Sequence, residues 1–211
     1  NKTRLIPRVC YSILNSTELD VVDSFNKRDY VDTNDITEFI YSLVDKKTIK
    51  EPTKNNSTQR ILCVSRCPGI TDSNEKEKKI SDDLRNLKKN SVQVIVSLLP
   101  SKELEQLGLN SLFSLIEKYG FEHIHFPLKD RSIPNNKTDF EKIVLYLVKK
   151  ILAGKVIHIH CNAGLGRSGL LAALICKSMS VSLDPIEYVR KFREGSIETK
   201  EQEEMIKSLF N

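Results

Sequence analysis

The sequence has no long apolar segment and little net charge, and each absence excludes a class of protein. Its longest apolar run covers residues 170–176, far fewer than the roughly 20 residues that cross a bilayer. The net charge is +5 in 211 residues, and it is spread through segments of mixed sign such as 75–79, which is not typical of nucleic-acid binding. The chain begins at Asn1 without a charged and apolar signal segment. We therefore expect neither a membrane span nor a nucleic-acid partner.

Cysteine is also scarce. A chain of this length builds a core without disulfide staples, and an odd number of widely spaced cysteines does not indicate a disulfide framework. With 39% hydrophobic and 29% charged residues, the composition is that of a soluble globular protein. The cysteine pattern predicts a reducing compartment, the cytoplasm or the nucleus. The five cysteines are Cys10, Cys63, Cys67, Cys161 and Cys176.

The hydrophobic pattern divides the chain near residue 60. Residues 1–59 are a poorly patterned lead-in with one helical stretch at 36–44 and a polar linker near 48–59. Residues 60–211 alternate between strands and helices, which predicts an α/β domain with a central, mainly parallel sheet flanked by helices. In such sheets, sites form at the carboxyl ends of the strands. The strands are expected at 61–64, 92–99, 123–126 and 156–160, and the helices at 80–89, 104–119, 138–152, 168–179, 185–192 and 199–210.

The strongest chemical signal is the segment 160–169 (HCNAGLGRSG). A predicted strand ends at Cys161, five residues with two glycines follow, and Arg167 leads into a strongly apolar helix. Small residues let successive backbone N–H groups turn toward one point, where the positive end of the helix adds its field. Such surroundings favour a thiolate, and arginine can hold two oxygens of a tetrahedral anion in its planar fork. The pattern predicts a phosphoryl-binding loop with Cys161 as nucleophile.

This segment resembles the signature loop of the cysteine-dependent protein tyrosine and dual-specificity phosphatases, in which a cysteine, five residues and an Arg-Ser or Arg-Thr pair follow in order. The resemblance covers roughly residues 60–210 and implies a cysteinyl-phosphate intermediate, formed without metal or cofactor. It implies that Arg167 clamps the phosphate, Ser168 stabilises the departing thiolate and His160 orients the cysteine. The expected phosphate-binding residues are Asn162, Ala163, Gly164, Leu165, Gly166 and Arg167.

The reaction also requires an acid for the departing oxygen. Residues 126–134 (FPLKDRSIP) follow a predicted strand, are bounded by prolines and resemble the acid loop of the same superfamily, with Asp130 in the place of the acid. The alternative is that Asp130 only caps a turn. Asp139 is a competitor, but its place at the start of a helix is explained by capping. Lys129 and Arg131 are either solvated charges or contacts for acidic substrate residues.

A third segment, 196–202 (SIETKEQ), resembles the loop in which two glutamines position the hydrolytic water. Only Gln202 matches, because Glu198 occupies the first place. Two interpretations of Gln202 remain open, a water-positioning residue and an exposed helix residue. A fourth expectation concerns oxidation, since a thiolate at Cys161 is oxidisable and Cys63 or another thiol is a candidate to form a disulfide with it.

Within this superfamily, residues 60–69 (RILCVSRCPG), the Gly-Leu-Gly-Arg-Ser loop and the Ile-Glu-Thr sequence at 197–199 are most similar to the kinase-associated phosphatase branch. Known members of that branch remove phosphate from threonine in a cyclin-dependent kinase. The resemblance therefore implies a phosphoprotein substrate, with a cyclin-dependent kinase among the candidates. The Lys-Asn-Arg-Tyr stretch of larger tyrosine-specific enzymes is missing. That difference favours a shallow site that accepts phosphoserine and phosphothreonine as well as phosphotyrosine.

Four alternatives stay open at this point. A phosphoinositide phosphatase typically carries lysines inside the loop, where this chain has Asn162, Ala163 and Leu165. An RNA 5′-triphosphatase uses the same loop with a basic surface. A catalytically weak phosphoprotein-binding module would lack one of the reactive residues. The two His-x-His pairs, 123–125 and 158–160, each place two imidazoles on one strand face, where they either bind a metal or pack.

Overall fold

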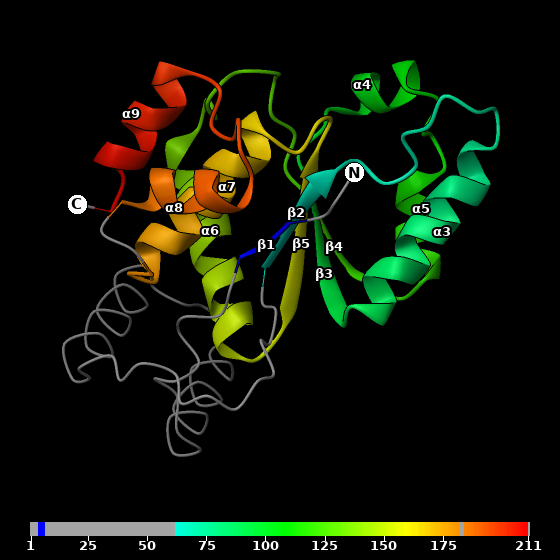
Figure 1. Cartoon of the computed structure of the whole chain (residues 1–211), viewed down its shortest axis with the longest axis horizontal. Coiled ribbons are helices and arrows are strands. Elements are labelled where there is room, and N and C mark those ends of the chain that lie inside the picture. Colours follow the sequence, from blue (N-terminus) through cyan, green and yellow to red (C-terminus); the bar gives the residue numbers. More distant parts are fainter. Residues whose placement is uncertain (1–3, 7–61, 182–183, 211) are drawn as a thin grey trace.

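The structure, a computed structural model, describes residues 4–6, 62–181 and 184–210. It contains a five-stranded sheet in the order β1-β2-β5-β3-β4, which runs through the centre of the molecule (Figure 1). Strands β2, β5, β3 and β4 are parallel, and β1 adds to the edge antiparallel to β2. The strands are β1 Arg4–Ile6, β2 Leu62–Arg66, β3 Val92–Ser97, β4 Glu122–His125 and β5 Val156–Cys161.

The composition of the central strands explains their position. All six residues of β5 are buried, and β3 is buried at every residue but one. Runs of β-branched and apolar residues suit strands that are covered on both faces, since both sets of alternating side chains then leave water. In Figure 1, α3 and α5 lie on one side of the sheet, and α6, α7, α8 and α9 lie on the other.

Most of the helices agree with the predicted segments. The longest, α6, begins at the cap Asn136, whose side chain accepts a hydrogen bond from the backbone N–H of Asp139. Helix α7 is buried over Gly166–Cys176 and forms the centre of its layer. The helices are α3 Lys76–Lys89, α4 Ser101–Gln106, α5 Leu112–Lys118, α6 Lys137–Leu152, α7 Gly166–Ser178, α8 Pro185–Phe192 and α9 Lys200–Ser208.

The prediction of one helix over 104–119 is wrong, because α4 and α5 are separate. Gly108 between them has a φ of +68°, which lies outside the right-handed helical region and ends α4. The apolar spacing nevertheless continued across the break, since Leu104, Leu109 and Leu112 all reach the same core. The spacing of apolar residues indicates which side chains are buried. It does not show where the backbone turns between them.

The predicted fold class is confirmed, including the loop between a strand and a buried helix. Strand β1 comes from the segment described above as a lead-in, and the division of the chain at residue 60 stays a prediction. The expected helix at 36–44 and the linker at 48–59 lie outside the described residues. Within the described ranges, no helix is both long and apolar enough to cross a membrane.

Candidate active site

The predicted phosphoryl-binding loop connects the end of β5 to the start of α7. Cys161 is the last residue of the strand and is 3% exposed. The backbone N–H of Gly164 points at its sulfur, with 3.2 Å between the nitrogen and Sγ. An N–H donor at this distance stabilises negative charge on sulfur. The structure thus brings the cysteine and a loop amide together as the sequence predicted.

Gly164 is required in this loop by both conformation and space. Its φ is +72°, in the left-handed region that side chains rarely adopt. A Cβ atom at this position would lie 2.1 Å from the carbonyl oxygen of Ser65, which no side-chain movement can relieve because the obstacle is backbone. Glycine therefore allows the loop to lie close against the end of β2. The backbone N–H of Cys67 holds it from the same side by donating to the carbonyl of Asn162 at 3.0 Å.

Arg167 lies beneath the loop with only 1% of its surface exposed. Its Nη1 lies 2.9 and 3.0 Å from the two carboxylate oxygens of Glu103 and 3.0 Å from the carbonyl of Leu128. Its Nη2 lies 3.0 Å from Oδ1 of Asp130. Its Nε has no hydrogen-bond partner in the described part of the chain. The guanidinium is therefore oriented by two carboxylates and keeps one buried N–H for another acceptor.

Glu103 is a site residue that sequence reasoning missed. It lies in the first turn of α4, which follows the carboxyl end of β3. The rule that sites form at carboxyl ends of parallel strands applied to this segment too. Only the loops after β4 and β5 carry a recognisable motif, whereas the segment after β3 has none.

Asp130 is the exposed partner of Arg167, with 63% of its side chain accessible. It precedes Arg131, whose φ of +55° makes a tight bend in the loop. The structure therefore places the predicted acid next to the predicted phosphate clamp. Asp139, the competitor, lies at the first turn of α6, where its carboxylate accepts from the side chain of Asn136. Asn136 and Asp139 thus hydrogen-bond each other as in a helix cap, with Asn136 as the cap residue.

Gln202 links two loops of the site. Its side chain is fully buried, so the interpretation as an exposed helix residue is wrong. Its Nε2 donates to the carbonyl of Ser132 in the acid loop at 3.1 Å, and its Oε1 accepts from the backbone N–H of Glu198 at 3.0 Å. In this geometry the amide of Gln202 holds the loops together. Its role toward water stays a prediction.

His160 is buried beside the cysteine and belongs to a chain of hydrogen bonds. Its Nε2 lies 2.7 Å from the hydroxyl of Ser97, which also lies 2.9 Å from Nε2 of His123. Burial, followed by the neighbouring histidines, lowers the pKa of His160 well below its usual range. Burial also lowers the pKa of His158 to about 3. These imidazoles are therefore neutral at physiological pH.

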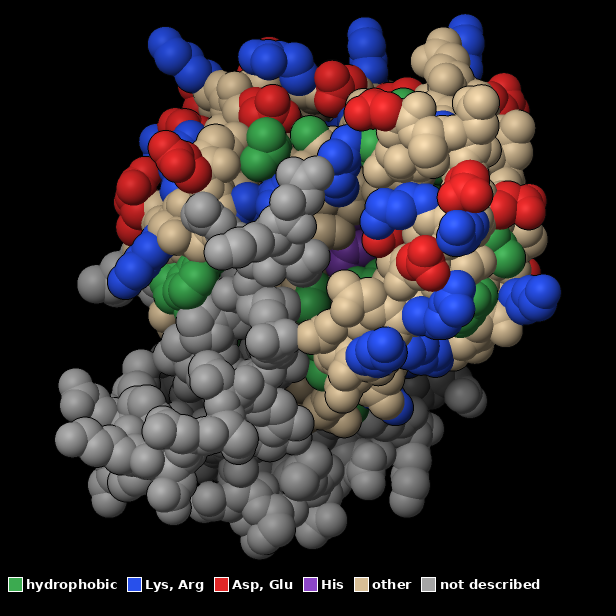
Figure 2. Space-filling view, turned by 45° about the vertical axis from the view of Figure 1, so that its right-hand side comes forward, with side chains coloured by type: hydrophobic (Ala, Val, Ile, Leu, Met, Phe, Trp, Pro, Cys, Tyr) green, Lys and Arg blue, Asp and Glu red, His purple; other side chains and the backbone are tan. Residues whose placement is uncertain are grey.

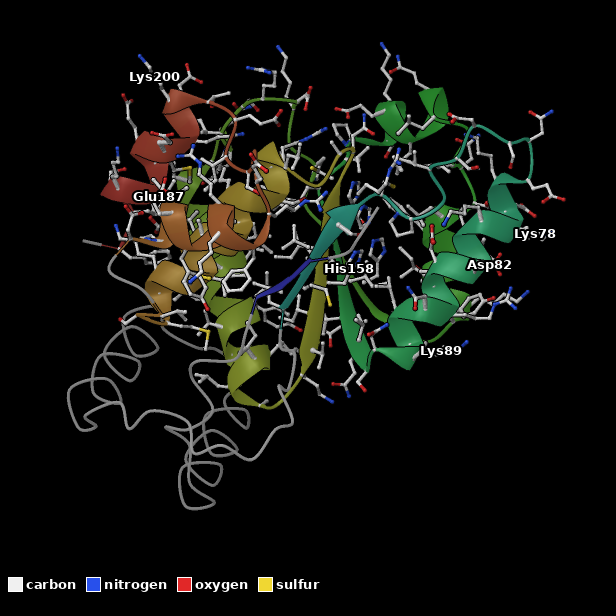
Figure 3. All side chains as sticks on the ribbon, in the orientation of Figure 1. Lys78, Asp82, Lys89, His158, Glu187 and Lys200 are labelled. Atoms are coloured by element: carbon white, nitrogen blue, oxygen red, sulfur yellow. The ribbon has the colours of Figure 1, made fainter. Side chains whose placement is uncertain are left out.

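The histidine pairs are arranged as packing residues. His158, which Figure 3 places on the sheet between the two helix layers, pairs with the hydroxyl of Ser65 at 2.7 Å. Its ring stacks on that of His160 with 5.6 Å between centroids. Among the residues that the structure describes, no group of three or more His, Cys, Asp and Glu side chains could hold a metal ion.

Two further groups lie near the loop. The hydroxyl of Ser168 is buried and has no hydrogen-bond partner in the described residues, which leaves it free to donate to an incoming group. Cys67 is buried at the end of β2, and burial together with the charge of Cys161 raises the pKa of its thiol. Cys67 is therefore near enough to Cys161 for the charge of Cys161 to act on it. The expected disulfide of Cys161 with Cys63 or another thiol stays a prediction.

A cleft of about 750 Å³ borders the loop on the side of α3. It is lined by the end of β2, the outer face of the loop and the end of α8, with Arg66, Lys79 and Arg193 as its basic residues and Asp83 and Glu194 as its acidic ones. The face shown in Figure 2 likewise has Lys and Arg side chains intermixed with Asp and Glu. The surface beside the site therefore carries charges of both signs.

Comparison with known proteins agrees with this architecture. The family described as "Polymorphic toxin system, DSP-PTPase phosphatase" matches residues 70–179, 110 of the 211 residues of the chain. Helices α3 to α7, the acid loop and the signature loop all lie within the match. The chain therefore belongs to the DSP-PTPase phosphatase family.

Named relatives point the same way. Cyclin-dependent kinase inhibitor 3 from Rattus norvegicus is 29% identical over 129 residues, which cover 59% of this chain and 60% of the relative. Phosphatidylglycerophosphate phosphatase PTPMT2 from Arabidopsis thaliana is 33% identical over 116 residues, which cover 53% of this chain and 47% of the relative. This chain thus spans between about half and three fifths of the length of these relatives.

Two solved structures show the same fold. Kinase associated phosphatase, crystallised with its catalytic-site cysteine replaced by serine, has a TM-score of 0.62 and 26% identity. That match covers 72% of this chain and 85% of the other. Tk-PTP in its active form has a TM-score of 0.55 and 29% identity, and the match covers 71% of this chain and 90% of the other.

Proposed function

We propose that the protein is a phosphatase that hydrolyses phosphotyrosine, phosphoserine or phosphothreonine in proteins through a cysteinyl-phosphate intermediate. One observation carries the proposal: Arg167, in the loop and helix that follow Cys161 at the end of β5, lies 3.0 Å from Asp130 in the loop that follows β4. The family provides independent support, since the chain belongs to the DSP-PTPase phosphatases.

In the first step the Cys161 thiolate attacks phosphorus in line with the bond to the substrate oxygen. The S–P bond forms, the P–O bond breaks, and the protonated Asp130 carboxyl gives its proton to the leaving oxygen. Arg167 and the loop N–H groups bind the remaining phosphoryl oxygens, on which charge is spread in the transition state. The unpartnered Nε of Arg167 is available for this contact, and the N–H of Gly164 lies beside the attacking sulfur.

In the second step water attacks the same phosphorus. The carboxylate of Asp130 takes a proton from the water, the S–P bond breaks, and the thiolate of Cys161 leaves. Ser168 is suited to stabilise that thiolate, because its buried hydroxyl has no other hydrogen-bond partner among the described residues. The other residues proposed to bind phosphate are the loop members 162–166.

The contacts of Arg167 imply an exchange when substrate binds. Its Nη2 is paired with Asp130, but a phosphoryl group carries more charge than a carboxylate and can accept two of the guanidinium hydrogens. The phosphate then displaces Asp130 from Arg167 and leaves the acid free beside the scissile oxygen. Arg167 stays oriented during the exchange because Glu103 remains on Nη1.

Kinase associated phosphatase and cyclin-dependent kinase inhibitor 3 are among the similar proteins, and this likeness supports a phosphoprotein substrate. A cyclin-dependent kinase is the partner that we propose. Since catalysis requires a free thiol, we expect the protein in the reducing cytoplasm or nucleus. Residues 60–211 form the proposed catalytic domain, and residues 1–59 an N-terminal extension.

The likeness to a phosphatidylglycerophosphate phosphatase supports a second candidate, a lipid phosphomonoester. The interior of the loop argues against highly charged inositol headgroups, because Asn162, Ala163 and Leu165 add no positive charge there. The test is turnover on one panel that contains phosphotyrosine, phosphothreonine and phosphoserine peptides, phosphatidylglycerophosphate and phosphoinositides. We expect turnover on the peptides. Turnover confined to the lipids would overturn the proposed protein substrate.

A further inference from the structure

A planar trans peptide couples the direction of a carbonyl to that of the next residue's N–H. The two bonds point in opposite directions from the same plane, so a contact that holds the oxygen on one side of a loop also holds the hydrogen on the other. In an anion-binding loop the N–H groups must point inward. The carbonyl oxygens of the same peptides then point outward. A donor that binds these oxygens on the outer face of the loop therefore also fixes the direction of the N–H groups on the inner face.

Arg193 is such a donor. Its Nε donates to the carbonyl of Gly164, and its Nη2 donates to the carbonyl of Ala163 at 2.7 Å. The Ala163 carbonyl shares a peptide with the N–H of Gly164, the group that lies 3.2 Å from Sγ of Cys161. The Gly164 carbonyl shares a peptide with the N–H of Leu165. One guanidinium therefore holds two consecutive peptide planes of the signature loop.

The position of Arg193 in the fold explains how it reaches the loop. It is the residue that ends α8, with extended φ and ψ of −144° and 91°, and its backbone N–H donates to Val189 at 2.9 Å. Helix α8 packs on α7, the helix that follows the signature loop. The side chain thus comes from an anchored backbone and crosses the outer surface of the loop, where it also lines the adjoining cleft.

We propose that Arg193 is a positioning residue for the anion site: it orients the N–H groups of Gly164 and Leu165 toward Cys161 without touching substrate. The inference rests on the proposed function for its catalytic meaning. The orientation of the loop is measurable without any turnover. Lysine cannot replace Arg193 fully, because a single ammonium group lacks the planar fork that holds two carbonyls at once.

The test uses the full chain and two alkylating probes of Cys161, anionic iodoacetate and neutral iodoacetamide. An oriented anion site favours iodoacetate, so the ratio of the two rates reports on the loop. Mass spectrometry of the labelled peptide locates the modification, and vanadate affinity gives a second readout. For Arg193→Met we expect the rate ratio and the vanadate affinity each to fall about tenfold, because both carbonyls lose their donor and the equivalent of one charge-assisted hydrogen bond from the loop N–H groups to the anion is lost. For Arg193→Lys we expect a smaller fall of about threefold, because the charge is retained.

The matched control is Arg85→Met on the exposed face of α3, where Arg85 pairs with Asp82, and it should leave both readouts unchanged. Unchanged readouts in a folded Arg193→Met would overturn the proposal, as would a wild-type ratio equal to that of a free thiol. If Arg193→Met does not fold, Arg193→Lys decides, and wild-type values in it would overturn the proposal. The two proposals can fail separately. If the wild type hydrolyses no phosphoester but the ratio of iodoacetate to iodoacetamide rates still falls in Arg193→Met, the proposed reaction is refuted and the positioning role is supported.

Discussion

The two loops that form the site are held in different ways. The signature loop after β5 is held through its backbone: Gly164 lies against the carbonyl of Ser65, and Arg193 binds two of its carbonyls. The acid loop after β4 has an exposed tip, where Asp130 is 63% accessible and pairs with the phosphate clamp. Its carbonyl at Ser132 is bound by the side chain of Gln202.

This difference matches the role that we propose for each loop. The signature loop stabilises developing charge, and such stabilisation is strongest when the donors are oriented before the reaction. In the proposed reaction Asp130 leaves Arg167 when phosphate binds and then exchanges protons with two different oxygens, so it requires freedom to move. Four substitutions test this division of roles, from the largest expected effect to the smallest.

Cys161→Ser should reduce turnover to background, because a serine hydroxyl in the same place is not ionised and is a far weaker nucleophile. Binding of a phosphopeptide should persist, since Arg167 and the loop N–H groups remain. Turnover is measured with phosphopeptides and binding by calorimetry. Measurable turnover by the variant would show that Cys161 is not the nucleophile.

Asp130→Asn should lower the maximal rate on an alkyl phosphate about 10²- to 10⁴-fold, the usual contribution of a general acid. The loss should be smaller on an aryl phosphate whose leaving group needs little protonation. Asp139→Asn is the matched control and should affect stability alone, because Asp139 lies in the first turn of α6. A pH–rate profile for the alkyl phosphate that is the same in Asp130→Asn and wild type would exclude Asp130 as the acid.

Glu103→Gln should lower kcat/KM about tenfold, because the amide keeps one acceptor for Arg167 but removes the charge that orients it. The change should appear mainly in KM if the guanidinium binds phosphate in the ground state. Glu105→Gln, at an exposed position on the same helix, is the control. Equal kinetics in both variants would show that Glu103 does not position the clamp.

His158→Gln should weaken the pH dependence of stability. The folded-state pKa of His158 is about 3, against an ordinary value of 6.5. Between these two pH values the imidazole is protonated in the unfolded chain and neutral in the folded chain. Stability is therefore intact above pH 6.5 and declines toward pH 3, by up to about 1.4 kcal/mol per pH unit for one group. Denaturant unfolding at pH 7.5 and 5.0 should show a weaker decline in the variant. An unchanged decline would assign the acid sensitivity to other groups.

The sequence predicted the structure best where the relevant residues lie close together in the chain. The strand–Cys161–loop–Arg167–helix order is local, and the structure confirms the fold that it predicted for that segment. The prediction was less successful at the helix near 104–119, because burial of Leu109 and Leu112 continued the apolar pattern across the turn at Gly108. It also missed the cap of α6, which is Asn136 rather than Asp139.

The sequence by itself determined the α/β class and predicted a nucleophile, a clamp and an acid, because each is encoded in a short segment whose chemistry can be recognised alone. The tertiary structure decided what supports them. Glu103, Arg193 and Gln202 act on residues 64, 29 to 30 and 70 positions away, respectively. Such contacts depend on how strands and helices pack. No local pattern encodes a side chain whose partner is brought beside it only by folding.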